Sequence, residues 1–85
     1  MNAKQCLNHG GEFPYDAPDS FWENSNNTPP KATDKAHATA RGIIADLEDR
    51  HTIKHGFADV DEATRVEIVN DLAEIIREGM KESAK

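Results

Sequence analysis

The adjacent prolines Pro29-Pro30 divide this 85-residue chain into two unlike parts. Residues 1–34 hold all four prolines and the pair Gly10-Gly11, and both residue types favour turns and interrupt helices. The remainder has no proline, and its apolar residues recur at helical spacing. The sequence therefore predicts an all-α module over residues 35–85 that carries an irregular, aromatic-bearing N-terminal arm over residues 1–34.

Two or three helices in a hairpin are expected in the module. The first begins after Thr33 or Asp34, since either side chain can cap a helix. Residues 51–57 form either a short second helix or a turn. The last helix extends from about residue 60 to residue 82, because Asp59 and Glu62 have the spacing of a capping box.

So small a module needs a partner to complete its core. Small domains bury a low fraction of their surface, and one cysteine, Cys6, allows no internal disulfide. The last helix has an apolar stripe wider than one neighbour requires. Gly42, beside small residues, would let another backbone approach closely. We therefore expect a homodimer with a four-helix arrangement.

The formal net charge of −6 argues against direct nucleic-acid binding, which needs clustered Lys and Arg. It is compatible with a protein partner that has a basic surface. No apolar run approaches the roughly 18 residues of a membrane span, and no signal-type segment is visible. We expect a cytoplasmic protein without a membrane partner.

Four of the five aromatic residues lie in the arm: Phe13, Tyr15, Phe21 and Trp22. A merely flexible linker would not concentrate aromatic residues. They either cover the helices of the chain itself or serve as anchors for a partner, and both interpretations remain open.

Carboxylates line one face of the last helix at positions i, i+4, i+7 and i+11, namely Glu67, Asp71, Glu74 and Glu78. They form either a solvated face or an acidic stripe that meets a basic partner. Paired helices with such carboxylates bind magnesium in the all-α nucleoside triphosphate pyrophosphohydrolases, but the first helix here lacks a matching pair. We therefore expect no enzyme.

Basic residues flank the expected junction between helices: Arg41, Arg50, Lys54 and Arg65. They either pair with nearby acidic residues or converge to hold an anionic nucleotide, because Arg side chains match phosphate oxygens.

Two pairs have the residue types of a zinc site, namely Cys6 with His9 and His51 with His55. Most structural zinc sites use at least two thiolates, and this set offers one. We expect no metal and no other cofactor, and keep these residues as an alternative.

The helical segments at residues 40–50, 53–54 and 65–69 read ARGIIADLEDR, IK and RVEIV, a pattern that resembles small uncharacterised proteins of bacteriophages and prophages. The resemblance extends over residues 35–79 and does not cover the arm. It implies a phage accessory protein in a bacterial host. Small acidic phage proteins with few enzymatic features often resemble inhibitors of host defences, including anti-CRISPR proteins.

The expected function is therefore to bind and block a host protein, namely a nucleic-acid-handling defence component such as a CRISPR effector. The acidic residues and the arm's aromatic residues would contact it. One alternative is a sponge that sequesters an anionic nucleotide signal at a subunit interface. Another is a structural or regulatory phage protein stabilised by a metal.

Overall fold

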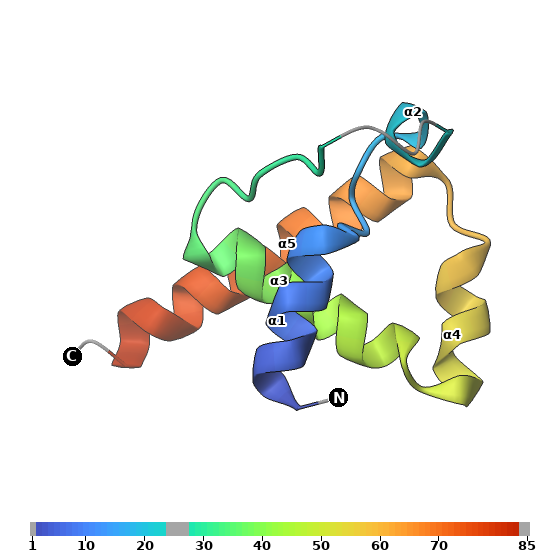
Figure 1. Cartoon of the computed structure of the whole chain (residues 1–85). Coiled ribbons are helices and arrows are strands. Elements are labelled where there is room, and N and C mark those ends of the chain that lie inside the picture. Colours follow the sequence, from blue (N-terminus) through green and yellow to red (C-terminus); the bar gives the residue numbers. More distant parts are fainter. Residues whose placement is uncertain (1, 24–27, 84–85) are drawn as a thin grey trace.

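The computed structural model describes residues 2–23 and 28–83, and all secondary structure in that part of the chain is helical. Figure 1 shows the arrangement of its elements, which are α1 (Ala3–Glu12), α2 (Asp19–Glu23), α3 (Lys35–Glu48), α4 (His51–Ala58) and α5 (Glu62–Ser83). The predicted all-α class is confirmed. The number of helices exceeds the prediction because two of them lie in the N-terminal arm.

Helix α3 is the central element, and it begins where the sequence predicted. The backbone N–H of His37 donates to Oδ1 of Asp34 at 2.9 Å, so Asp34 is the N-cap. One face of α3 packs against α5, and α1 packs against α3 as well (Figure 1).

The hydrophobic core lies between α3 and α5. Ala36, Ala40 and Ile44 recur at every fourth position of α3, so they share one face of the helix. They pack with Val69 and Ala73 of α5, both of which are almost fully buried. Small side chains dominate this core, which brings the two helices close together.

The prediction that residues 1–34 are irregular is wrong, because α1 and α2 lie there. Asn2 and Gln5 form a capping box at the start of α1, in which each side chain accepts the other's backbone N–H at 2.9 Å. The helix ends before Pro14, as expected from the restricted conformations of a residue that precedes proline.

Gly10 was interpreted as a turn signal, but it is a packing residue inside α1. A Cβ atom on Gly10 would lie 2.6 Å from the carbonyl carbon of Arg41 and 2.8 Å from the nitrogen of Gly42. A Cβ atom on Gly42 would lie 2.9 Å from Cδ2 of Leu7. The close backbone approach predicted at Gly42 is therefore confirmed, and its partner is α1.

Residues 51–57, left open by the sequence, belong to α4. The start of α5 was placed too early. Asp61 rather than Asp59 accepts a backbone N–H of the first turn, from Thr64 at 3.3 Å. Glu62 does not close a capping box with Asp59, because its Oε1 accepts the backbone N–H of Asp19 at 2.6 Å. None of the described helices combines the length and apolarity needed to cross a bilayer.

Candidate partner-binding surfaces

A buried polar cluster fixes the N-terminal segment onto α3. Asp16 accepts from Nε of Arg41 at 2.8 Å and from Nε2 of His37 at 2.7 Å. Arg41 also donates to the carbonyl of Pro30 at 2.7 Å, and the N–H of Thr33 donates to Nδ1 of His37 at 2.9 Å. Two side chains of α3 therefore hold both Asp16 and the segment that precedes α3.

The contacts of this cluster assign its charge states. Nδ1 of His37 accepts a hydrogen bond from the backbone N–H of Thr33, so the ring hydrogen lies on Nε2, which faces Asp16. Burial opposes ionisation of Asp16, but hydrogen bonds from Arg41 and His37 outweigh it and lower the pKa of Asp16. Asp16 and Arg41 therefore form a buried ion pair, with Arg41 only 4% exposed.

Tyr15, next to this cluster, covers the helices of the chain itself. It lies in the hydrophobic core, and its hydroxyl donates to the carbonyl of Phe57 at 3.0 Å. The two rings meet edge to face with centroids 5.5 Å apart. Burial, and then the charge of Glu48, raises the pKa of the Tyr15 hydroxyl. The interpretation of Tyr15 as a partner anchor is therefore less favoured than its structural role.

Two other aromatic residues of the arm remain exposed. Phe13 is 51% exposed and Trp22 is 45% exposed. The Phe21 ring, which is partly buried, meets Trp22 edge to face with centroids 4.7 Å apart. The His9 ring lies 4.9 Å from that of Phe13. The arm therefore presents aromatic side chains to solvent at a defined position.

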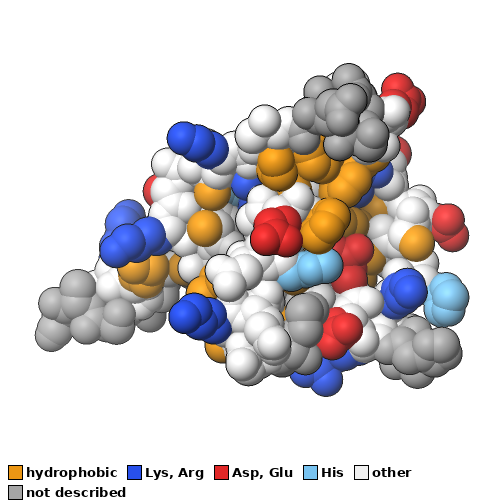
Figure 2. Space-filling model, in the orientation of Figure 1, with side chains coloured by type: hydrophobic (Ala, Val, Ile, Leu, Met, Phe, Trp, Pro, Cys, Tyr) orange, Lys and Arg blue, Asp and Glu red, His pale blue; other side chains and the backbone are white. Residues whose placement is uncertain are grey.

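Phe13 and Trp22 line a hollow of about 290 Å³ together with His9, the buried Tyr15 and the partly buried Glu48, and we call this hollow the aromatic groove. The residues come from α1, the segment after it, α2 and the end of α3. Figure 2 shows hydrophobic side chains gathered on the upper part of one face of the molecule, with acidic and histidine side chains beside them.

Glu48 is the charged group of the aromatic groove. Its side chain is partly buried, and among the described residues it has no hydrogen-bond or ion-pair partner. Desolvation raises the pKa of this carboxyl, although the nearby His9 opposes the shift. The groove thus combines aromatic walls with a carboxylate whose hydrogen-bonding capacity is unused within the described chain.

The four predicted acidic residues of α5 are all exposed, on the side opposite the buried Val69 and Ala73. Glu74 pairs with Arg77, and Glu78 approaches Lys81 at 3.4 Å. Ile75 is 66% exposed and lies beside Asp71 and Glu78, at the edge of this stripe. The outer face of α5 is therefore acidic with an exposed apolar residue along one edge.

The four predicted basic residues are not gathered in one hollow. Arg41 is buried in the cluster with Asp16, and Arg65 pairs with Asp19 and donates to the carbonyl of Val60 at 2.8 Å. Arg50 pairs with the nearby Asp46 at 3.1 Å. Lys54 is exposed beside Glu48 in a neighbouring hollow.

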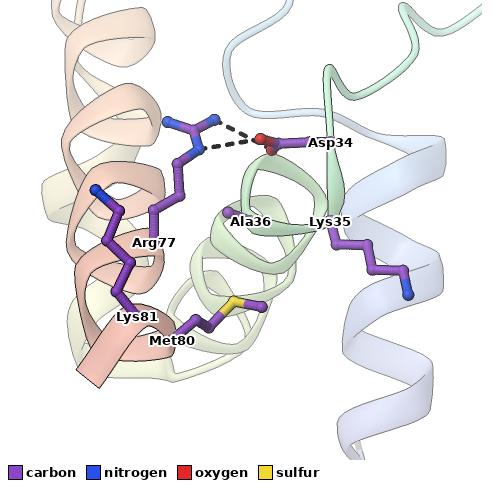
Figure 3. A pocket seen from close by; sticks show the side chains of 6 residues that line it. All are labelled: Asp34, Lys35, Ala36, Arg77, Met80 and Lys81. Atoms are coloured by element: carbon purple, nitrogen blue, oxygen red, sulfur yellow. Dashed lines mark hydrogen bonds and ion pairs between the residues drawn. The ribbon is translucent and has the colours of Figure 1, made fainter. Parts of the chain in front are cut away.

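Another hollow, of about 600 Å³, lies where α5 passes the start of α3 (Figure 3). The Arg77 guanidinium points toward Asp34 and donates to its two oxygens at 3.0 and 3.1 Å, whereas Lys35 and Lys81 point away. The hydrogen bonds from Arg77 lower the pKa of Asp34. Asp34 therefore both caps α3 and attaches it to α5.

The residues considered for zinc do not form a group of metal ligands in the described part of the chain. Cys6 is buried in α1, whereas His9 and His55 are exposed. The side chain of His51 is outside the described residues. Within the described part, no group of three or more potential ligands could hold a metal ion.

No protein-family model, curated protein or solved structure matched this chain. The resemblance to phage proteins therefore stays a prediction. Sequence reasoning missed Asp16, His37 and Glu48. No local pattern marks the first two, since their contact joins positions 21 residues apart. Glu48 lies between Asp46 and Asp49 in the sequence, where nothing distinguishes it from these acidic neighbours.

Proposed function

We propose that this protein acts by stoichiometric, non-enzymatic binding to a protein with a basic surface. The observation that supports the proposal is the outer face of α5, where four exposed carboxylates form a stripe with the exposed Ile75 at its edge. Asp71 and Glu78 lie four residues before and three residues after Ile75, so they are its neighbours on the helix surface. An exposed apolar side chain beside charged groups is suited to a protein interface.

Part of the negative charge of the acidic face is not paired within the described chain. Glu74 and Glu78 have basic neighbours on the same helix, but Glu67 and Asp71 have no ion pair among the described residues. Exposed carboxylates of this kind contribute to the rate and specificity of association with a basic surface. Binding should therefore weaken as salt is added.

The proposed target is a nucleic-acid-handling defence protein of a bacterial host, such as a CRISPR effector, and the proposed effect is to block it. Proteins that bind nucleic acid present clustered Lys and Arg to phosphates. An acidic helix face can occupy such a surface. The phage-type resemblance of residues 35–79 supports the same setting.

The proposal is tested by capturing a purified CRISPR effector on the immobilised protein at low and high salt. We expect capture at low salt and its loss in the Asp71→Lys variant, because reversal adds repulsion at the centre of the acidic face. Glu12→Lys is the matched control, since Glu12 is exposed on α1. Equal capture by both variants would contradict the role of the acidic face.

We also propose that two copies associate through a different, mainly apolar patch on α1 and α3. Leu7 and Ile43 are exposed and line a hollow of about 420 Å³ with Cys6, Gly42 and Asp46, and Asp46 pairs with Arg50. A symmetric dimer places the same patch on both sides, so an apolar patch is self-complementary whereas the acidic face of α5 is not. Pairing of two α1–α3 units would give a four-helix arrangement, but from other helices than the hairpins of residues 35–85 that the sequence predicted.

A further inference from the structure

We infer that the aromatic groove binds a single arginine side chain of the protein partner, with its guanidinium against Phe13 and Trp22 and paired with Glu48. This inference rests on the proposed function, because the arginine belongs to the same basic partner. It adds a second contact, distinct from the acidic face of α5, and gives that contact a defined chemistry.

The walls of the groove are suited to a cation. Phe13 and Trp22 each expose about half of their surface, and their places are set by α1 and α2. Aromatic faces attract a cation that lies within about 6 Å of the ring centre, and tryptophan does so most strongly. Exposed aromatic residues also dominate the energetics of protein interfaces.

Glu48 supplies the counter-charge. Its carboxylate lines the groove with Phe13 and Trp22, and no described residue donates to it. A partly buried carboxylate loses hydration without a compensating hydrogen bond. An incoming cation that donates two hydrogen bonds would compensate for the lost hydration and would neutralise the charge of the carboxylate. The carboxylate and the aromatic side chains therefore favour the same kind of ligand.

The form of the groove favours arginine over lysine. A guanidinium is planar, so it can stack on an aromatic ring while its edge pairs with both oxygens of a carboxylate. A lysine ammonium is more strongly hydrated and has no flat face to stack. The volume of about 290 Å³ is at the lower limit of small-molecule sites, which suits one side chain.

Among the described residues, no Lys or Arg side chain forms an ion pair with Glu48. Lys54 lines the neighbouring hollow with Glu48, but no ion pair joins the two side chains. His9 lines the groove and is engaged by the ring of Phe13.

The test titrates the full chain with N-acetyl-arginine amide and follows the fluorescence of Trp22, the one tryptophan in the sequence. N-acetyl-citrulline amide, which has nearly the same shape without the charge, is the control ligand. N-acetyl-lysine amide is the third ligand. We expect a saturable change with arginine, a weaker one with lysine and none with citrulline.

Two variants assign the response to Glu48. Glu48→Gln keeps the shape of the side chain and removes its charge, and we expect arginine affinity to fall at least about tenfold, as for a lost charge-assisted hydrogen-bond pair. Glu67→Gln makes the same change on the outer face of α5 and should leave arginine affinity unchanged. Circular dichroism establishes that both variants are folded.

The outcomes separate this inference from the proposed function. No saturable response to arginine, an equal response to citrulline or lysine, or full affinity in Glu48→Gln would overturn the arginine site. If one of these results were found while the protein still captured a basic protein in a salt-sensitive way, the proposed function would still be supported. Arginine binding without such capture would contradict the proposed function alone.

Discussion

Asp16 is the residue on which the attachment of the N-terminal segment depends. It pairs with the buried Arg41 and accepts from His37, so its removal would leave a buried guanidinium without a counter-charge. We expect Asp16→Asn to lower the free energy of unfolding by about 3 kcal/mol, as when one partner of a buried ion pair is removed. Urea denaturation at neutral pH measures this loss.

Asp46→Asn is the control, because Asp46 pairs with Arg50 on the exposed surface of α3 and such pairs contribute less than about 1 kcal/mol. The pH dependence gives a second check. The pKa of Asp16 is lower in the folded protein, so its contribution is present above the ordinary aspartate pKa of 3.8 and is lost as pH falls through the folded-state pKa. Equal losses in both variants would contradict the buried pair.

The carboxylate of Glu48 should lower the stability of the fold at neutral pH, whereas that of Asp16 raises it. Desolvation raises its pKa in the folded protein, so the ionised carboxylate disfavours folding at neutral pH. We expect Glu48→Gln to raise the melting temperature slightly at pH 7, with a gain below about 1 kcal/mol because the group is partly solvated. The gain should disappear below the unfolded-state pKa, where the carboxyl is protonated in both states.

Thermal unfolding across the acidic range, with Glu67→Gln as the control, measures the effect of Glu48. A destabilising effect of Glu48→Gln at pH 7 would show that the carboxylate stabilises the fold. A stabilising effect fits a residue retained for binding, since binding groups commonly reduce stability.

At the level of single residues, the sequence predicted what depends on local spacing. Asp34 as the cap of α3 and the exposed carboxylates of α5 follow from positions within one helix. The pairing of Asp16 with Arg41 and the isolation of Glu48 depend on how separate segments meet. No spacing rule along the chain contains that information.

At the level of helices, α1 shows that glycine can either interrupt a helix or allow close packing inside one. Gly10 and Gly11 suggested a turn, yet both lie within α1 and neither has a positive φ angle. The sequence also holds a cap signal at Asn2 and Gln5, which the prediction of an irregular arm did not use. Only the position of α3 against Gly10 explains why glycine is needed there.

The two glycines of α1 provide a matched pair of substitutions. Gly10→Ala places a Cβ atom 2.6 Å from the carbonyl of Arg41, so α1 must move away from α3. We expect a loss of about 2 kcal/mol, within the range for overpacking. Gly11→Ala meets nothing within 4 Å and should be neutral or stabilising by up to about 1 kcal/mol through helix propensity.

Urea denaturation measures both alanine variants, and hydrogen exchange of the α1 amides locates the effect. Faster exchange confined to α1 in Gly10→Ala is the expected result. If Gly11→Ala were as destabilising as Gly10→Ala, the close contact between α1 and α3 would not be the cause.

For the whole molecule, the two proposed associations should respond to salt in opposite ways. Binding of a basic protein by the acidic face weakens as salt screens opposite charges. Self-association through the apolar patch at Leu7 and Ile43 brings together two chains of net charge −6, so salt should strengthen it by screening their repulsion. One protein can therefore show both trends only if it uses two different surfaces.

Sedimentation velocity at low and high salt tests the dimer, for which we expect twice the mass of the chain at high salt. Ile43→Glu should return it to a monomer, because a buried charge at the centre of a symmetric interface is repelled by its own copy. Ile53→Glu is the control, since Ile53 is 37% exposed against 39% for Ile43 and lies on α4. Dissociation by both variants would place the interface elsewhere, and a monomer at every salt concentration would leave the α1–α3 patch to another partner.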